Sequence, residues 1–313
     1  MASSSGSSSD PGTVPADQEY FETVSYHGRE YHKYCLDNNV YFCPVDEDEV
    51  ERLGIMHAVF LRVFDNRLIF PPIRNPRRIL DCGFGAGDWA IDVAERYENC
   101  EVTGIDVCPH MFPEQYPPNF DPQVDDLNGR FTFPSNHFDL VHSQMMADGI
   151  HANRWRQYIA DIFRVTRPGG WCQMVEIYFN AQSDNGTLTH DHALRRWSRR
   201  YLRAAQRYKD PRAPLQMEAM LRSAGFQDIE SRMMTLPMCG WPTNERERAI
   251  GRANRDNVQR LLSSMAIYPF TEFLGMSISE VQLLVAQARS EASNPAFKAY
   301  FPLYVCIGKK PRR

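Results

Sequence analysis

ILDCGFGAGDW, residues 79–89, is the stretch of the sequence that decides the fold. It begins as a short apolar run typical of a buried strand, and the apolar residues of 88–97 follow at helical spacing. Between them lies the pattern D-x-G-x-G-x-G, formed by Asp81, Gly83, Gly85 and Gly87. Glycine adopts positive φ and lets the backbone approach a ligand closely, and the start of a helix offers free N–H groups. The stretch therefore predicts a ligand-binding turn between a strand and a helix; a plain structural turn is the alternative.

The segments on either side of this turn favour an α/β fold with a doubly wound sheet. Further strands are predicted at 101–107, 138–144, 171–179, 226–237 and 300–308. Further helices are predicted at 46–64, 153–166, 194–205, 215–225, 244–263 and 278–293. Because strands and helices alternate as far as residue 179, we expect a Rossmann-like parallel sheet with right-handed crossovers.

The overall composition is that of a globular protein and excludes several classes of function. With 313 residues, 43% of them hydrophobic and 24% charged, we expect one folded domain over 19–313. Residues 1–18 are rich in Ser, Gly and Pro and are expected to form a disordered tail. The net charge of -4 gives no general attraction for phosphate groups, so nucleic-acid binding is not expected.

The eight cysteines point to an intracellular protein without a metal. They lie far apart, with no C-x-x-C pair and no Cys/His cluster at the spacing of zinc ligands, so no metal is expected. The N-terminus lacks the basic and apolar regions of a secretory signal, and no later stretch approaches the roughly 18 apolar residues of a membrane span. We therefore expect a cytoplasmic or nuclear protein that is neither secreted nor membrane-bound.

Aspartates near the glycine turn favour S-adenosyl-L-methionine (SAM) over a dinucleotide. The glycine spacing differs from G-x-G-x-x-G, and Asp81 precedes the glycines, where it would face the positive amino-acid end of SAM. Asp106 ends the next strand, where a carboxylate accepts hydrogen bonds from both ribose hydroxyls. Asp125 and Asp126 follow one more crossover, where a carboxylate would meet the adenine amino group. An ordinary turn residue is the alternative reading of each aspartate after the loop.

Motifs spread over residues 26–311 resemble those of one family. They read YHGREYHKY, DEDEVERLGIMH, ILDCGFGAGDWAIDVA, VTGIDVCP, DDLNGRFTF, FDLVHSQM, RPGGWCQMVE, the GF of SAGFQDI, and NPAFKAYFPLYVCIGKKP. In these motifs the chain resembles the LaeA-like fungal methyltransferases, within the class I SAM-dependent group. The glycine loop departs from the family, because G-F-G-A-G stands where G-T-G-T-G or G-C-G-T-G is common.

The resemblance implies a seven-stranded sheet whose last strand is antiparallel. It also implies that helices from the N-terminal segment and from an insertion at about 240–295 cover the site. By position, Asp81 and the three loop glycines would hold the methionine end of SAM, Asp106 the ribose and Asp126 the adenine. The expected cofactor-binding set is completed by Val107, Leu127 and Ser143.

The acceptor side of the reaction offers candidates but no identified base. Methyl transfer is an in-line displacement, for which a base matters only if the acceptor is a hydroxyl, a thiol or a protonated amine. Candidate bases near the predicted strand ends are His142, His151 and Glu176, with Tyr178 as a group that could orient the acceptor. A structural role is the alternative for each of them.

Three functional hypotheses follow from the sequence and the resemblance. The leading one is an enzyme that methylates a small molecule of fungal secondary metabolism. The alternative is a nuclear regulator of secondary metabolism that acts with velvet-type protein partners, and the C-terminal run KKPRR resembles a short nuclear-import signal. The third is a SAM-binding cyclase that uses the charge of the cofactor without consuming it.

Overall fold

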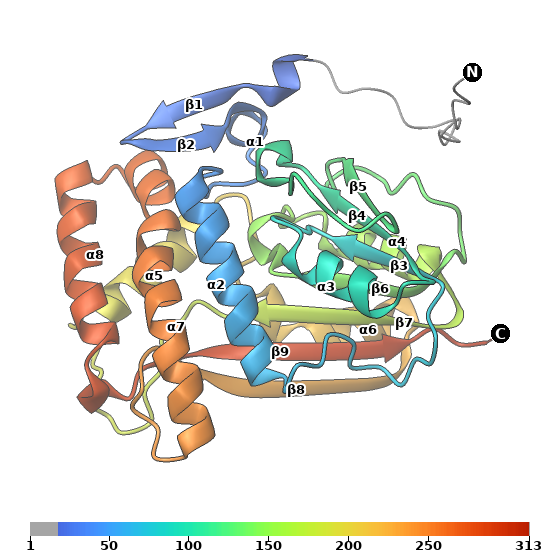
Figure 1. Ribbon diagram of the computed structural model, residues 1–313. Coiled ribbons are helices and arrows are strands. Elements are labelled where there is room, and N and C mark those ends of the chain that lie inside the picture. Colours follow the sequence, from blue (N-terminus) through green and yellow to red (C-terminus); the bar gives the residue numbers. More distant parts are fainter. Residues whose placement is uncertain (1–17, 313) are drawn as a thin grey trace.

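A seven-stranded sheet forms the centre of the computed structural model, which describes residues 18–312 (Figure 1). Its strands run in the order β5-β4-β3-β6-β7-β9-β8. Their bounds are β3 Arg78–Cys82, β4 Glu101–Asp106, β5 Phe120–Val124, β6 Phe138–Gln144, β7 Thr166–Ile177, β8 Gln227–Pro237 and β9 Tyr300–Lys309.

The direction of the strands confirms the predicted fold class. The pairs from β5 to β7 are all parallel, whereas β9 runs antiparallel to both of its neighbours, β7 and β8. The strand order reverses between β3 and β6, because the chain proceeds from β3 towards one edge and later from β6 towards the other. Ligands of such sheets bind beyond the carboxyl ends of the strands at this reversal.

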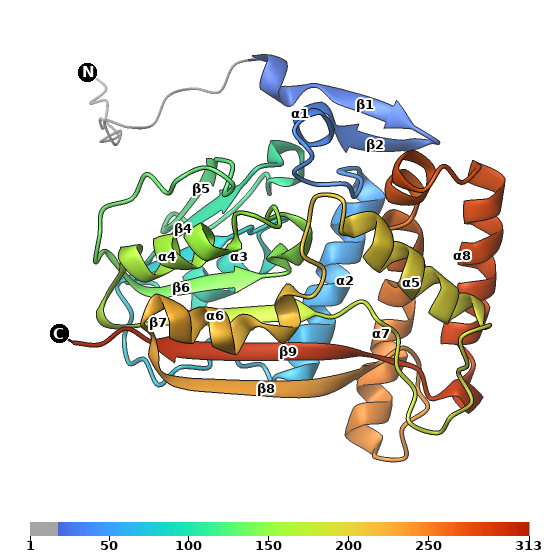
Figure 2. The same ribbon diagram turned by 180° about the vertical axis from the view of Figure 1, so that it is seen from behind.

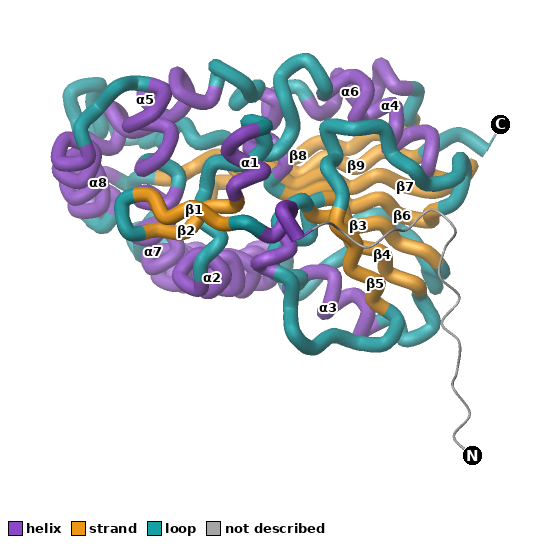
Figure 3. Tube along the Cα trace, turned by 90° about the horizontal axis from the view of Figure 1, so that it is seen from above, coloured by secondary structure: helices purple, strands orange, loops and turns teal. Residues whose placement is uncertain are grey.

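Helices cover both faces of the sheet and give three layers (Figure 3). Helix α3 (Asp88–Arg96) lies on one face, and α4 (Trp155–Val165) and α6 (Met217–Ala224) lie on the other, as Figure 2 shows from behind. Neighbouring residues of β3 point to opposite faces of the sheet. Ile79 packs in the apolar cluster that contains α3, and Leu80 packs in the cluster that contains α4. The layers therefore follow from the period-two pattern of the strands.

A group of longer helices stands at one end of the sheet (Figure 1). It comprises α2 (Glu47–Val63), α5 (Ala193–Ala205), α7 (Glu245–Ser264) and α8 (Ile278–Ala292), which share one apolar cluster around the fully buried Trp197. A hairpin of β1 (Thr23–Tyr26) and β2 (Arg29–His32), followed by α1 (Lys33–Asp37), lies above these helices (Figures 1 and 3). None of the described helices is long and apolar enough to cross a bilayer.

The structure corrects one predicted boundary and adds elements that the sequence did not predict. Strand β7 begins at Thr166, directly after α4, so the strand start predicted at residue 171 is wrong. Gly169 and Gly170 exchange backbone hydrogen bonds with Lys310, which extends the pairing. The β1–β2 hairpin and α1 were not predicted. Nor was β5 located, because FDPQV carries Pro122 and a half-exposed face, both typical of an edge strand.

The two ends of the chain carry the predicted disordered tail and the basic run that resembles a nuclear-import signal. The predicted tail lies outside the described residues, except for Gln18, which begins a short 3-10 helix. In the C-terminal basic run, Lys309 belongs to β9, and Lys310 Nζ donates hydrogen bonds to Asn136 Oδ1 and Phe163 O; Arg313 lies outside the described residues. The described lysines of the run are therefore bound to the domain.

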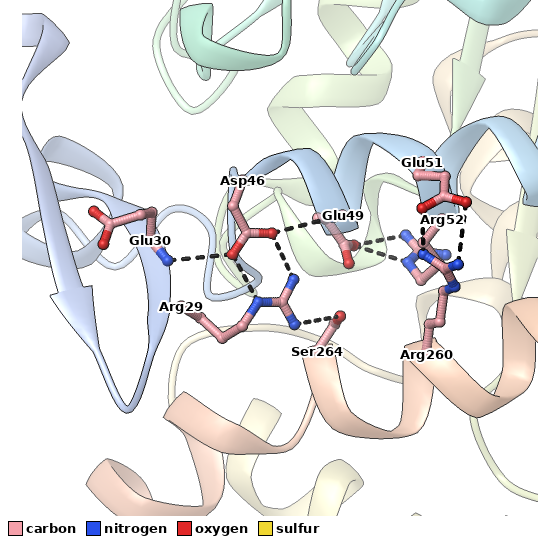
Figure 4. Close-up of polar contacts among 8 residues, drawn as sticks. All are labelled: Arg29, Glu30, Asp46, Glu49, Glu51, Arg52, Arg260 and Ser264. Carbon is pink, nitrogen blue, oxygen red and sulfur yellow. Dashed lines mark hydrogen bonds and ion pairs between the residues drawn. The ribbon is translucent and has the colours of Figure 1, made fainter.

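Ion pairs attach the N-terminal hairpin to the helices beneath it (Figure 4). Arg29 donates two hydrogen bonds of 2.6 Å to Asp46, whose carboxylate also caps the N-terminus of α2. One turn further on, Glu49 and Arg52 form a buried pair at 2.7 Å. Glu51 pairs with Arg260 of α7 at the surface. These contacts fix the hairpin, α2 and α7 relative to one another.

The two pairs on α2 allow a matched comparison of a buried and an exposed carboxylate. We expect Glu49→Gln to destabilise the protein by about 3 kcal/mol, because it leaves the Arg52 charge buried without a counter-charge. Glu51→Gln, two residues away, should cost less than about 1 kcal/mol, since Glu51 is exposed and water reaches the half-buried Arg260. Urea unfolding followed by circular dichroism measures both, and equal losses would contradict this account.

Candidate functional site

The turn between β3 and α3 has three residues in the left-handed region. Gly83, Gly85 and Gly87 have φ of 73°, 59° and 87°, which explains why glycine occupies these positions. The N–H of Gly83 donates to Ile105 O at 2.7 Å, and Gly87 forms the N-cap of α3. The turn is thus tied to the end of β4.

Phe84, the bulky residue of the loop, points away from this turn. Its ring is buried against Phe112 and Phe120, where the absence of a side chain at Gly104 leaves room for it. The departure from the common G-T-G-T-G pattern therefore fills the core next to β4.

A cavity lies beyond the carboxyl ends of β3, β4, β5 and β6, at the reversal of the strand order. Its wall comes from six parts of the chain: the N-terminal segment, α2, the glycine turn and the ends of β4, β5 and β6 with the segments that follow them. The lining residues are Val40, Tyr41, Leu53, Gly83, Gly85, Asp106, Val107, Cys108, Met111, Asp125, Asp126, Leu127, Asn128, Gln144, Met145, Met146, Gly149 and Ile150. Six of the nine predicted cofactor-binding residues lie in this wall, namely Gly83, Gly85, Asp106, Val107, Asp126 and Leu127.

Asp106 is the carboxylate held most firmly in the wall. Its Oδ2 accepts a hydrogen bond of 2.8 Å from Gly85 N–H, and its Oδ1 accepts one of 2.8 Å from Cys108 N–H. Burial raises its pKa, although these N–H groups oppose the shift. Because a carboxylate accepts about four hydrogen bonds, Asp106 retains lone pairs for hydroxyl donors of a ligand.

Two further carboxylates make the lining acidic. Asp126 Oδ1 accepts hydrogen bonds from the backbone and the side-chain amide of Asn128, at 2.9 and 2.8 Å, and Asp125 Oδ1 accepts one from Asp126 N–H. Burial raises the pKa of Asp125, although the hydrogen bond from Asp126 N–H opposes the shift. Three carboxylates in one wall favour a ligand with positive charge or with several donors.

Asp81 lies behind the wall, two residues before Gly83 of the glycine turn. It is 2% exposed, and burial together with the charge of Asp106 holds its pKa well above the usual range. A charged carboxylate at this depth is costly unless an opposite charge balances it. A ligand with an ammonium group next to the glycine turn would remove that cost.

The other two predicted cofactor residues also lie outside the wall. Gly87 caps α3, and Ser143 points to the opposite face of the sheet, where its hydroxyl bonds to Tyr158 at 2.8 Å. Gly87 and Ser143 are close in the sequence to the cavity residues Gly85 and Gln144. The contacts of Gly87 and Ser143 therefore support the shape of the cavity indirectly.

The structure does not bring the histidine candidates to the cavity wall. His142 faces α3, stacked on Trp89 with ring centroids 3.8 Å apart, and burial lowers its pKa to about 3. His151 Nε2 donates to Asn39 O at 3.0 Å, and its pKa is lowered by burial and then by the charge of Lys209. The half-buried Tyr178 follows β7, and its backbone N–H donates to Pro302 O. In these positions neither His142 nor His151 lines the cavity.

Glu176 supports the segment that follows β6. Its carboxylate accepts hydrogen bonds from Met146 N–H at 2.7 Å and from Ala147 N–H at 3.3 Å, and Met146 belongs to the wall. Burial raises the pKa of Glu176 to about 8, and the nearby Asp148 adds to the shift. Glu176 thus positions part of the cavity wall.

A buried polar cluster next to Glu176 was not predicted. Burial raises the pKa of Asp148 to about 6, and the hydroxyl of Tyr201 donates to this carboxylate. Burial lowers the pKa of Lys209 to about 7, and its ammonium group donates to Val40 O and Gly149 O, both of them wall residues. No spacing in the sequence connects these residues, since they come from different elements.

Sequence reasoning also missed the N-terminal part of the wall. Val40 and Tyr41 precede the glycine turn by about forty residues and carry no motif that indicates a ligand. The fold itself explains the part of the wall at the end of β6, because ligands of such sheets bind beyond the carboxyl ends of the strands. Gln144, Met145 and Met146 form this part of the wall.

Comparisons with known proteins agree with this geometry. Residues 79–170 match the family described as "Methyltransferase domain". "Secondary metabolism regulator laeA" of Aspergillus fumisynnematus is 32% identical over 312 residues, which cover 98% of this chain and 80% of the relative. "Protein-methionine methyltransferase laeA" of Emericella nidulans is 31% identical over 311 residues, covering 97% and 81%.

Among solved structures, phosphoethanolamine N-methyltransferase 2 of Haemonchus contortus, in complex with S-adenosyl-L-methionine, shares the fold. The TM-score is 0.50 at 21% identity, with 83% of this chain and 52% of the other covered. At this level the similarity concerns the architecture of the domain alone.

Close packing at the glycine turn predicts the effect of adding a single methyl group. In Gly83→Ala the new Cβ would collide with Met146 Sδ, whereas in Gly186→Ala, at the same φ of 73°, nothing lies within 4 Å. Both variants incur the left-handed strain of about 1–2 kcal/mol. We expect Gly83→Ala to lose about 1–3 kcal/mol more, measured by urea unfolding, because the core must shift. Equal losses would show that Met146 moves aside freely.

The raised pKa of Glu176 predicts a pH dependence of stability. An unfolded glutamate titrates near about 4.3, so folding favours the protonated form. The stabilising contribution is therefore complete below that pH and is lost as the pH rises towards 8. Glu176→Gln mimics the protonated side chain, and its stability relative to the wild type should increase from pH 5 to pH 8 in urea unfolding. The exposed Glu101→Gln serves as control, and parallel pH curves for all three proteins would refute the assignment.

Proposed function

This chain belongs to the LaeA family and carries a methyltransferase domain, and from this premise we propose that it methylates proteins in the control of fungal secondary metabolism. It is a SAM-dependent methyltransferase. The observation that supports the proposal most is the acidic cavity at the reversal of the strand order, with Asp106 held in its wall by two backbone N–H groups.

The residues of the cavity suit the parts of SAM. The buried Asp81, behind Gly83 and Gly85, would balance the ammonium group of the methionine end, and the glycines would let the backbone approach it. Asp106 would accept hydrogen bonds from the ribose hydroxyls. Asp126 would meet the adenine amino group, between the side chains of Val107 and Leu127.

SAM supplies a methyl group made electrophilic by a sulfonium ion. The protein's part is to align the acceptor with this methyl group and to exclude water. Tyr41, Leu53 and Met145 suit this task, because they line the cavity with mostly apolar surface. Burial holds the pKa of Tyr41 well above its usual range, so this hydroxyl stays protonated and takes no proton from an acceptor.

An acceptor that needs no base fits this wall best. A methionine thioether is such an acceptor, since its sulfur carries a lone pair and no proton, and the Emericella nidulans relative is named for methyl transfer to protein methionine. The new bond joins the thioether sulfur to the methyl carbon while the bond from that carbon to the cofactor sulfur breaks. The products are a methylsulfonium side chain and S-adenosylhomocysteine.

A small molecule of secondary metabolism is the second candidate acceptor. The observation that favours it is the enclosure of the cavity by Val40 and Tyr41 of the N-terminal segment, which leaves better access for a small acceptor than for a folded protein. Velvet-type partners remain a proposal that follows from the resemblance alone. A nuclear site of action is a proposal of the same kind.

Transfer of a labelled methyl group distinguishes these acceptors. The purified protein is incubated with methyl-labelled SAM alone, with a fungal protein extract, and with a metabolite extract of the same cells. We expect label in protein, located at methionine by peptide mass spectrometry, and an equal amount of S-adenosylhomocysteine. Label only in small molecules would support the second candidate, and SAM binding without either product would overturn methyl transfer.

A pair of aspartate substitutions tests the ribose assignment. Asp106→Asn should weaken SAM binding by about 1–3 kcal/mol, or roughly 5- to 150-fold, because a hydrogen-bonded charge is lost. Asp121→Asn, on the exposed edge of the adjacent strand β5, should leave the affinity unchanged. Isothermal titration calorimetry measures the affinity, and circular dichroism verifies that both variants are folded. Equal affinities of Asp106→Asn and wild type would refute the assignment.

A further inference from the structure

A cluster of metal-ligand side chains lies next to the cavity, although their spacing in the sequence predicts none. His32 ends β2, Cys35 belongs to α1, and Cys108 follows β4, 73 positions after Cys35. Each is 1% exposed. The ligand atoms of all three lie within 4.8 Å of one another, with Cys35 Sγ 3.5 Å from Cys108 Sγ and 3.2 Å from His32 Nδ1.

The hydrogen bonds of His32 leave the lone pair of Nδ1 available to bind a metal. Its Nε2 lies 2.6 Å from Tyr20 O, and because a carbonyl oxygen only accepts, Nε2 carries the hydrogen. The lone pair of the neutral ring therefore resides on Nδ1, which faces Cys35. A ligating histidine whose other nitrogen donates to a backbone carbonyl is the common arrangement at metal sites.

His110 shows the same pattern beside this cluster. Its Nε2 donates to Phe21 O at 2.9 Å, and its Nδ1 is buried without a hydrogen-bond partner in the part of the chain that the structure describes. The ring centroids of His32 and His110 lie 4.9 Å apart. A buried nitrogen that lacks a partner is costly, and a metal ion would provide one.

We propose that His32, Cys35 and Cys108 bind one zinc ion, and that the neighbouring His110, whose nitrogens lie outside this group of ligand atoms, turns towards the ion as the fourth ligand. Two thiolates and two imidazoles form a common tetrahedral ligand set for zinc. Zinc bonds of about 2.3 Å to sulfur and about 2.0 Å to nitrogen separate two sulfurs by about 3.8 Å, and a sulfur from a nitrogen by about 3.5 Å. The observed separations of 3.5 and 3.2 Å are each about 0.3 Å shorter, so His32 and the cysteines need only small outward shifts.

The charge of this zinc site also suits its buried position. Two thiolates balance the two positive charges of zinc, so the filled site would carry no net charge into the protein interior. Sulfur and imidazole ligands favour zinc over calcium or magnesium, which prefer oxygen.

Zinc in this place would join the N-terminal segment to the wall of the cavity. Cys108 lines the cavity and donates its backbone N–H to Asp106, while Tyr20 of the N-terminal segment donates its hydroxyl to Val107 O at 2.8 Å. The ion would add coordinate bonds to these contacts. Its role is structural and does not depend on the function proposed above.

Metal analysis of the reduced, full-length protein tests the site. We expect about one zinc per chain by inductively coupled plasma mass spectrometry, and, after chelation and titration with Co²⁺, an intense thiolate-to-cobalt absorption band at one equivalent. His32→Gln, Cys35→Ser and Cys108→Ser should each weaken zinc binding by more than about 100-fold, the upper range for loss of an outer-shell partner. His110→Gln should weaken it as well.

Matched controls and a second measurement keep the test decisive. Cys100→Ser and His137→Gln alter the same residue types outside the cluster and should retain the zinc content of the wild type. If a ligand variant fails to fold, alkylation of the wild type replaces it, because zinc should protect Cys35 and Cys108 from iodoacetamide more than the other cysteines.

Three results would overturn the zinc proposal. The first is a reduced wild type that binds neither Zn²⁺ nor Co²⁺. The second is metal binding that survives in all four ligand variants. The third is a disulfide between Cys35 and Cys108 in the purified protein whose reduction yields no metal binding; the pair would then be a redox couple.

Discussion

The structure depends on the backbone of the turn that joins β3 to α3. Within five residues the chain must leave the sheet, pass through three left-handed glycines and start a helix, and it does so against the end of β4. Hydrogen bonds from Gly83 to Ile105 O and from Gly85 to Asp106 Oδ2 make β3, β4 and α3 one unit. Because the turn also forms the floor of the cavity, the conformation that closes the core is the one that exposes backbone groups to a ligand.

The N-terminal segment closes the side of the cavity that the sheet leaves open. It contributes Val40 and Tyr41 to the cavity wall and is held in place by Arg29 on Asp46, by Tyr20 on Val107 and by the Cys/His cluster. On the other side, Lys209 donates to Val40 O and Gly149 O and so links the region after α5 to the same wall. The cavity is therefore enclosed by contacts between segments that are distant in the sequence, and its shape responds to changes far from the glycine turn.

Local patterns predicted most of the fold, whereas the enclosure of the site could not be predicted. Apolar runs and helical spacing identified the central strands and the long helices, and glycines with an aspartate at the next strand end located the cofactor side. Strand β5 was not predicted, because Pro122 and the polar residues of this edge strand lack the apolar pattern of a buried strand. His142 and Ser143 show a second limit. They lie within β6, so alternation turns them to opposite faces of the sheet, and only residues from Gln144, the last of the strand, onwards reach the cavity. The Cys/His cluster was not predicted, because its two cysteines lie 73 residues apart and form no local sequence motif.

The position of β9 has a consequence for biosynthesis. This strand, the last along the chain, lies between β7 and β8 and pairs with both. While the ribosome is still translating residues 238–299, β7 and β8 both exist without the partner that they share, and each offers an unsatisfied backbone edge to other chains. Nascent domains fold as units once their elements are available. The half of the sheet around β7 can therefore close only after translation has reached β9, and until then the growing polypeptide is exposed to aggregation and to capture by chaperones.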